Sequence, residues 1–229
     1  GVVNLASTTN LTAVTAGPAA SIEYTGSLTD LSAALGAGVV YQPTAGYSGS
    51  DTLTVVIDDQ GNTGTGGALN DSDTVAITVT AINDAPTVTV PSAQSVNEDG
   101  SLSLSTANSS AISVADVDAS SGALKLTLSV SNGVVSLAST TNLTAVTAGP
   151  AASIEYTGSV TDLNAALGAG VVYQPTAGYS GSDTLTVTID DQGNTGTGGA
   201  QTDSDTVAIT VTAVNDAPTV TVPGAQSAN

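Results

Sequence analysis

Short stretches in which apolar and polar residues alternate follow one another along most of the chain. The clearest is Thr206-Val-Ala-Ile-Thr-Val-Thr212, where the apolar side chains of Val207, Ile209 and Val211 lie two residues apart. A period of two is typical of a β-strand with one buried face. Within residues 85–216 the pattern predicts strands at about 86–90, 100–106, 111–115, 124–130, 133–138, 152–157, 171–174, 184–190 and 205–213.

One segment, residues 159–168, has the pattern of a helix instead. Ser159 and Asp162 form a Ser-x-x-Asp start, after which apolar side chains recur at Leu163, Ala166 and Leu167, and Gly168 follows. A hydroxyl or acidic side chain at the first position, i, i+3, i+4 apolar spacing and a closing glycine together indicate a short helix. We expect it to cross one end of the sheets.

The number and length of these elements predict an all-β fold. Seven or more short strands in about 130 residues favour an antiparallel β-sandwich with one short helix, and an antiparallel barrel is the alternative. The composition agrees, because Val and Thr favour strands and the many Gly, Ser, Asn and Asp residues favour tight turns. The chain has no Phe, Trp or Met, so its core must be built from Val, Leu, Ile, Ala and Tyr.

An internal repeat sets the domain organisation. Residues 1–97 match residues 133–229 without a gap at 88 of 97 positions, which gives a period of 132 residues. A unit of this length is a whole domain and not one layer of a solenoid. The nine differing pairs are Asn4/Ser136, Leu28/Val160, Ser32/Asn164, Val56/Thr188, Leu69/Gln201, Asn70/Thr202, Ile82/Val214, Ser92/Gly224 and Val96/Ala228.

The repeat predicts three parts: residues 1–84 are the C-terminal part of one repeat, residues 85–216 are a complete repeat, and residues 217–229 are the first strand of a following one. We therefore expect this sequence to be an interior window of a longer protein. The first part lacks counterparts of residues 85–132, which leaves a sheet edge open. Either a part of the protein outside this sequence completes it, or another chain donates strands, for which residues 217–229 are candidates.

Charge and missing residue types limit the possible functions. The chain has 20 acidic residues, one Lys or Arg, and no His or Cys, for a net charge of -19. Without His and Cys, the usual catalytic nucleophile-base pairs and the usual zinc, copper and haem ligands are missing, so we expect no enzyme. Phosphate repels this charge, so nucleic acids are excluded as partners, and no apolar run is long enough for membrane insertion. Multivalent cations are the natural partners.

Four acidic or amide-rich motifs occur in a fixed order in the complete repeat. They are Ile82-Asn83-Asp84-Ala85-Pro86, which recurs as Val214-Asn215-Asp216-Ala217-Pro218, then Val96-Asn97-Glu98-Asp99-Gly100, Asp116-Val117-Asp118, and Ile189-Asp190-Asp191-Gln192-Gly193. Together they resemble the cadherin-like repeats of giant bacterial surface proteins, including RTX-type adhesins. The resemblance implies tandem immunoglobulin-like sandwiches, a secreted or bacterial cell-surface location, and calcium at the junctions between repeats.

The residue types support calcium as well. Calcium takes six to eight oxygen ligands, and this chain offers clustered carboxylates and amides without competing nitrogen or sulfur ligands. We expect one junction to use Asp51, Asn83, Asp84, Asp116, Asp118, Asp190 and Asp191, and the next to use Glu98, Asp99, Asp183, Asn215 and Asp216. The alternative is that these side chains only cap backbone N–H groups at turns. For Asp71, Asp73, Asp203 and Asp205 both interpretations stay open.

Other features carry weaker expectations. The glycine-rich loop of residues 61–67 lacks the lysine of a phosphate-binding loop, so we expect a flexible hairpin tip. Lys125 is expected on a strand edge. Tyr173 and Tyr179 are expected to seal one end of the sandwich, with a sugar-binding platform as the alternative.

These observations lead to one functional hypothesis and its alternatives. The leading hypothesis is an extracellular spacer of an adhesin or surface filament, stiffened by calcium and contacting neighbouring repeats or other copies in the filament. Calcium is scarce in the cytosol, so such a chain would stay flexible until it is secreted. The alternatives are a calcium-dependent, lectin-like carbohydrate-binding module and an ice-binding surface built from the Thr residues of the strands.

Overall fold

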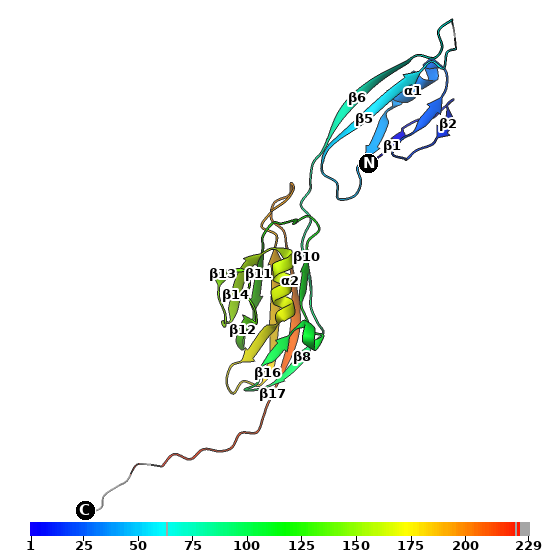
Figure 1. Ribbon diagram of the computed structural model, residues 1–229. Coiled ribbons are helices and arrows are strands. Elements are labelled where there is room, and N and C mark those ends of the chain that lie inside the picture. Colours follow the sequence, from blue (N-terminus) through cyan, green and yellow to red (C-terminus); the bar gives the residue numbers. More distant parts are fainter. Residues whose placement is uncertain (63, 223, 225–229) are drawn as a thin grey trace, which may run out of the picture. The chain divides into compact units, whose positions relative to one another are not determined.

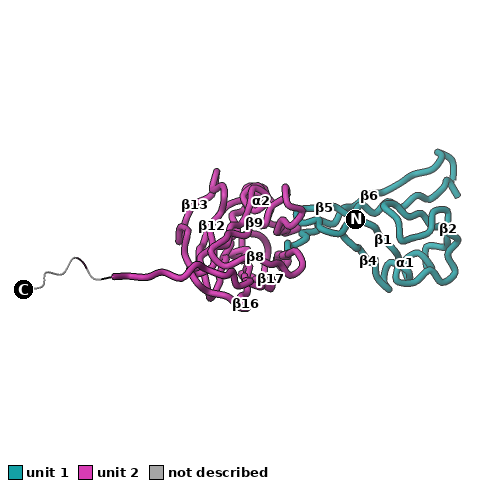
Figure 2. The backbone as a smooth tube through the Cα atoms, turned by 90° about the horizontal axis from the view of Figure 1, so that it is seen from below, with its two compact units in different colours: residues 1–81 teal, residues 82–229 magenta. Residues whose placement is uncertain are grey.

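The computed structural model describes residues 1–62, 64–222 and 224 (Figure 1). The chain divides into two compact units, unit 1 at Gly1–Ala81 and unit 2 at Ile82–Asn229 (Figure 2). The division falls three residues before position 85, which the repeat predicts as the start of the complete domain. Residues 82–84 lie with unit 2 because Asn83 is hydrogen-bonded to loops of that unit.

Unit 2 holds the complete repeat, with eleven strands, one α-helix and one 3-10 helix in its described residues. In chain order these are β7 (Thr87–Thr89), β8 (Gln94–Asn97), β9 (Leu102–Leu104), η1 (Thr106–Asn108), β10 (Ser113–Ala115), β11 (Leu124–Ser129), β12 (Gly133–Leu137), β13 (Thr144–Thr147), β14 (Ser153–Gly158), α2 (Val160–Ala169), β15 (Val171–Pro175), β16 (Gly181–Asp190) and β17 (Thr202–Thr212).

The strands of unit 2 form two main sheets. One has six strands in the order β13-β14-β11-β16-β17-β8, the other has three in the order β12-β15-β9, and β7 pairs separately with β10. All pairings among these described strands are antiparallel except that of β8 with β17, which is parallel. The structure thus confirms the prediction of an all-β sandwich.

Alternate residues of the strands fill the core between the sheets. Leu124, Leu126 and Leu128 of β11 are buried, while the residues between them face outward. The same alternation buries Leu185, Val187 and Ile189 of β16, and further residues of β14, β15 and β17 complete the cluster. Burying apolar area contributes about 25 cal/mol per Å², so this interior is the main source of stability.

The helix forms because its ends are capped and one face is apolar. Ser159 accepts a hydrogen bond from the backbone N–H of Asp162, and Leu163, Ala166 and Leu167 are buried, as the sequence predicted. The predicted end at Gly168 is wrong: the helix continues to Ala169, and Gly170, with a φ of 142°, ends it. The helix also runs alongside the strands next to β10 and does not cross one end of the sheets (Figure 1).

The strand predictions need three corrections: two strands were missed and one residue was misplaced. β8 and β13 were not predicted; all four residues of β13 are exposed, so no buried face marks it in the sequence. Lys125 is not at a sheet edge, because β11 lies between β14 and β16. It points to the outer face, where its ammonium group lies 3.4 Å from the carboxylate of Asp190 on β16.

Unit 1 has the same elements as the back part of unit 2. They are β1 (Val2–Leu5), β2 (Thr12–Thr15), β3 (Glu23–Thr25), α1 (Leu28–Ala37), β4 (Val39–Gln42), β5 (Gly49–Asp58) and β6 (Asn70–Val79). They form three separate two-stranded sheets, β1-β4, β2-β3 and β5-β6. Unit 1 therefore has the strands of a sandwich without the strand that joins β14 to β16 in unit 2.

Candidate metal centre

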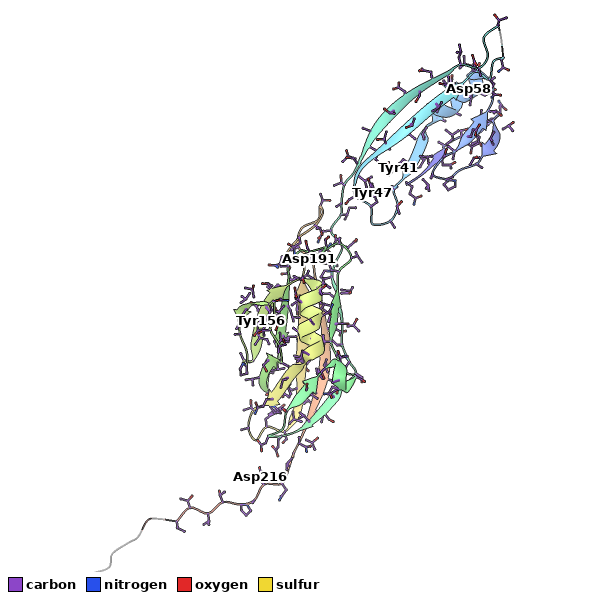
Figure 3. The ribbon with its side chains drawn as sticks, in the orientation of Figure 1. Tyr41, Tyr47, Asp58, Tyr156, Asp191 and Asp216 are labelled. Carbon is purple, nitrogen blue, oxygen red and sulfur yellow. The ribbon has the colours of Figure 1, made fainter. Side chains whose placement is uncertain are left out.

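The candidate site lies at one end of unit 2, where three segments meet. They are the linker of residues 82–84, the loop of residues 116–121 after β10, and the loop of residues 191–201 between β16 and β17. Figure 3 labels Asp191 at this end of the unit. Hydrogen bonds link all three segments, so the site belongs to one packed region.

Asn83 is the centre of the linker's attachment. It is only 3% exposed, its side-chain amide donates to the carboxylate of Asp191 and to the carbonyl of Gly199, and its backbone N–H donates to the carbonyl of Thr197. The side-chain amide of Gln201 donates to the Asn83 carbonyl at 2.8 Å. The side-chain NH2 group, the backbone N–H and the backbone carbonyl of Asn83 thus all have partners in the loop. The side-chain oxygen Oδ1 has no partner among the described residues.

The loop of residues 191–201 fits closely around this linker. Gly196 has a φ of 90°, and a Cβ atom on it would lie 2.5 Å from the backbone nitrogen of Asn83. Only glycine allows that approach. In unit 1 the equivalent Gly64 has a similar φ of 93° but nothing within 4 Å of a Cβ position. We expected this glycine-rich loop sequence to be a flexible hairpin tip. In unit 2 it instead packs closely against the linker.

Asp116 and Asp118 lie on the neighbouring loop. Oδ1 of Asp116 accepts the backbone N–H groups of Asp118 and Ala119, both at 3.1 Å, which is the turn geometry that Asx residues favour. Oδ2 of Asp118 accepts the backbone N–H of Asp84 at 3.0 Å. The hydroxyl of Thr195 donates to the Asp118 carbonyl at 2.6 Å. Hydrogen bonds therefore use one oxygen of each carboxylate, a turn cap in Asp116 and a linker contact in Asp118, and leave the other oxygen free of such a bond.

The remaining oxygens define the candidate site. Oδ1 of Asn83, Oδ2 of Asp116 and Oδ1 of Asp118 are buried and have no hydrogen-bond partner among the described residues. They are the only buried side-chain nitrogen or oxygen atoms of the described chain in this condition. A buried oxygen without a partner costs about 1–3 kcal/mol, so three in adjoining segments call for a ligand that accepts electron pairs.

The electrostatics of the two carboxylates favour a cation. Burial raises the pKa of Asp116 above its ordinary value, and the adjacent Asp118 carboxylate raises it further. Two neighbouring, half-buried carboxylates disfavour each other's charge, whereas a cation between them would stabilise both. The donor set consists of oxygens alone, which suits calcium or magnesium and not the softer metals.

The site has few charged ligands. The described residues contain no group of three or more His, Cys, Asp or Glu side chains placed to hold one metal ion. The candidate set has two carboxylates and one amide, so a calcium ion here would take its other ligands from water or backbone carbonyls, as calcium sites commonly do. With water or backbone carbonyls as the other ligands, these residues fit a calcium ion.

The other residues predicted for this junction have different partners. Asp191 organises its own loop: Oδ1 accepts the N–H groups of Gly193 and Gln201, and Oδ2 accepts Asn83. Asp190 accepts the N–H of Gln192 and pairs with Lys125. Asp84 contributes its backbone N–H to Asp118. These residues position the linker and loop, and we do not include them among the direct ligands.

Asp51 belongs to unit 1, where its carboxylate accepts the Tyr41 hydroxyl at 2.6 Å and the N–H of Thr52 at 2.8 Å. The hydrogen bond to Asp51 raises the pKa of Tyr41 to about 12 and lowers that of Asp51. These contacts give Asp51 a structural role within unit 1.

Asp183, the equivalent residue in unit 2, was predicted as a ligand of the next junction. It is buried, and its two oxygens accept four hydrogen bonds, from the N–H groups of Ser131, Asn132 and Thr184 and from the Tyr173 hydroxyl. Burial by itself raises the pKa of Asp183, but these hydrogen bonds outweigh it and lower the pKa. With its lone pairs used, Asp183 is placed as a structural residue and not as a ligand.

The remaining predicted residues lie at the opposite end of unit 2. Oε1 of Glu98 accepts the N–H of Val214 at 2.7 Å, which fixes the segment that follows β17. Asp99 occupies a left-handed turn position with a φ of 62° and is exposed. Asn215 and Asp216 are exposed as well, and Figure 3 shows Asp216 on that segment. None of these four has a buried oxygen without a partner.

The expected seal of the sandwich end is present. Tyr173 is fully buried, and its hydroxyl donates to Asp183 at 2.8 Å. Tyr179 is half-buried, and its hydroxyl donates to the carbonyl of Ser182 at 2.6 Å. A sugar-binding platform needs exposed rings, and these two rings pack against the core.

Sequence reasoning missed the residues that hold the linker. Gly196, Thr195 and Gln201 were not singled out, although Gln201 is one of the nine positions at which the repeats differ, with Leu69 in the first copy. A difference confined to a loop of otherwise near-identical repeats was the available signal. Its meaning depends on a contact 118 residues away in the sequence, which no local pattern shows.

Comparisons with known proteins add no family assignment. No protein-family model matches the chain, and no curated protein matches it. Within the described part of the chain, no helix is long and apolar enough to cross a membrane.

Proposed function

We propose that this protein is an extracellular spacer of a bacterial adhesin or surface filament, and that calcium bound by Asn83, Asp116 and Asp118 stiffens the linker end of each repeat. The single observation that carries the proposal is the set of three buried, unpartnered oxygens on those residues. One comes from the linker and two from the adjoining loop, so a shared ion would tie the linker to the domain.

The repeat itself supports a spacer. The back part of the repeat occurs twice in near-identical form in one chain, and the sequence has no His or Cys to build an enzyme's usual catalytic groups. Tandem domains of this kind add length with each copy. The low number of basic residues leaves the acidic charge uncompensated, so without cations the repeats repel one another.

Residues of the protein already position the linker before an ion binds. The loop of residues 191–201 already holds Asn83 through hydrogen bonds, and Asp118 already holds the backbone of Asp84. A bound calcium ion supplies positive charge to the two carboxylates. The repulsion between Asp116 and Asp118 would then be reduced, and the unpartnered oxygens of Asn83, Asp116 and Asp118 would share one ligand. That shared ligand would restrict the motion of the linker.

Calcium titration by calorimetry tests the site. We expect the full chain to bind calcium more tightly than magnesium, and we expect the double variant Asp116→Asn with Asp118→Asn to lose that binding. The matched control, Asp205→Asn with Glu155→Gln, removes two negative charges from the outer faces of β17 and β14 and should retain it. Equal binding by both double variants would show that the cation associates with the overall charge and not with this site.

Small-angle scattering tests the stiffening. With millimolar calcium the full chain should give the profile of a molecule with a defined linker, and with a chelator the profile of a flexible one. The Asp116→Asn, Asp118→Asn chain should stay flexible in both. If calcium binds but the two profiles coincide, the ion does not act as a stiffener, and the spacer mechanism is wrong.

A further inference from the structure

Unit 1 exposes apolar side chains that are buried in unit 2. Ile57 is 41% exposed and Val75 is 54% exposed, whereas their counterparts Ile189 and Val207 are fully buried. Two adjoining hollows of about 460 and 1140 Å³ lie along this face, and both are lined by residues of unit 1 alone, among them Ile22, Tyr24 and Ile57. Exposed apolar side chains that gather on one face often mark a binding surface.

Unit 2 shows which segment covers the same face. There β11 lies between β14 and β16, paired with Ser153–Gly158 on one side and with residues 186–190 on the other. In unit 1 the counterparts of those strands, β3 and β5, are in separate sheets. β14 has six residues but β3 only three, in agreement with the loss of a pairing partner.

The buried strand residues that face the covering segment are the same in both units. None of the nine differences between the repeats falls on the buried residues of β14, β15, β16 or β17 or on their copies in unit 1. Two differences do reach the covering segment. Thr188 pairs with Thr127 of β11, and unit 1 has Val56 there. Asn164 makes two hydrogen bonds to the backbone of Val114 in β10, and unit 1 has Ser32 there. The face is thus preserved for the same occupant, with one weaker anchor.

The surroundings of Asp51 indicate where this occupant enters. Asp183 accepts hydrogen bonds from the N–H groups of Ser131 and Asn132, the two residues directly before Gly133. Asp51 keeps its tyrosine and Thr52 partners, and the backbone nitrogen of Gly1 lies 3.9 Å from one of its carboxylate oxygens. The missing pair of donors corresponds to the two positions immediately before Gly1.

Gly1 is also seated as Gly133 is. A Cβ atom on Gly1 would lie 2.6 Å from the carbonyl oxygen of Gln42, and one on Gly133 would lie 2.4 Å from that of Gln174. Both glycines therefore pack against the strand that pairs with theirs, β4 and β15 respectively. A segment joined to Gly1 would start from the same position as residues 131–132 do in unit 2.

We propose that the open apolar face of unit 1 is the binding surface for a further copy of the front half of the repeat, a segment with the sequence of residues 85–132 joined directly to Gly1. A strand like β11 enters between β3 and β5 and merges the sheets of unit 1 into one. A second copy of the present chain is a poorer source, because its single front half is already packed in its own unit 2.

The test compares three chains by hydrogen exchange. The first is the full chain, and the second carries residues 85–132 joined before Gly1. The third carries the same extension with the copies of Leu124, Leu126 and Leu128 changed to Asp, which keeps length and linkage but removes the apolar face of the strand. We expect the amides of Leu53, Val55 and Ile57 to exchange at least about 100-fold more slowly in the second chain than in the other two.

Each outcome decides the proposal. Equal exchange in the second and third chains, or no gain in the second, overturns it. The full chain is also measured by sedimentation over a range of concentrations. If it forms a stable dimer in which the amides of unit 1 are already protected, a second copy covers the face and the proposal is wrong. A full chain that stays monomeric with fast exchange in unit 1 supports it.

Discussion

The two units share the back part of the repeat with nearly the same residues, but only unit 2 also has the front part. In unit 2 the sheets enclose a fully buried interior, whereas in unit 1 the same side chains line an open face. Unit 1 keeps the helix cap, the hairpins and the Tyr–Asp hydrogen bond, with Ser27 and Asp30 repeating the contacts of Ser159 and Asp162. Local structure therefore depends on the back part of the repeat alone, and burial depends on β7 to β11.

The linker region shows the same contrast. Asp59 and Asp191 organise equivalent loops, since each accepts the N–H groups two and ten residues further along. Only Asp191 also accepts the side chain of an asparagine from a linker. The two aspartates thus cap their loops in the same way, and in unit 2 Asp191 also holds the linker residue Asn83.

The largest expected effect comes from shortening one core leucine in each unit. Leu185 is fully buried and Leu53 is only partly buried. We expect Leu185→Ala to lower the free energy of unfolding of unit 2 by about 2–5 kcal/mol, and Leu53→Ala to cost unit 1 about 1 kcal/mol or less, because a cavity arises only where the surroundings are packed. Urea unfolding followed by residue-resolved hydrogen exchange separates the two units. Equal losses would show that unit 1 is packed as tightly as unit 2.

The next effect concerns two glycines with nearly the same backbone conformation. Gly196→Ala and Gly64→Ala share the strain of a positive φ, but only Gly196 lies against the linker backbone. We expect Gly196→Ala to cost about 1–3 kcal/mol more than Gly64→Ala, because the new methyl group must displace Asn83. Thermal unfolding measures both, and faster exchange of the Asn83 amide should appear in Gly196→Ala alone. Matching losses would mean that strain at the turn explains everything.

The smallest effect is a dependence on pH that one carboxylate contributes. The pKa of Asp183 is lowered in the folded state, so its stabilisation is complete above the unfolded value of 3.8 and is lost as the pH falls through the lower folded value. Asp183→Asn should therefore lose stability at neutral pH and show a flatter decline below about pH 4 than the unaltered chain. Urea unfolding at several pH values tests this.

A control with the same substitution separates Asp183 from the general effect of charge. Asp205→Asn also removes one negative charge, but its side chain is exposed and accepts only the adjacent Thr206 N–H. Its stability should follow the unaltered chain at every pH. A decline in Asp183→Asn as steep as that of the control would show that the hydrogen bonds to Asp183 do not depend on its ionisation.

Much of the fold could be read from local patterns. Alternation marked most strands, and Ser159, Asp162 and the Leu163 face marked the helix, because those signals depend on neighbours within a few residues. β13 was not predicted because it buries no face. The helix end was misplaced because Gly168 and Gly170 are equivalent as local signals. The central position of β11, and with it the pairing of Lys125 with Asp190, depends on strands that are distant in the sequence.

By itself the sequence determined the repeat, the all-β class and the concentration of oxygen ligands, since these depend on composition, period and identity. Only the tertiary structure decided what each acidic residue does. Asp183 and Asp116 look alike in the sequence, yet one is saturated by four donors and the other keeps a buried oxygen without a partner. That difference comes from which backbone N–H groups the fold brings to each carboxylate, and local sequence does not encode it.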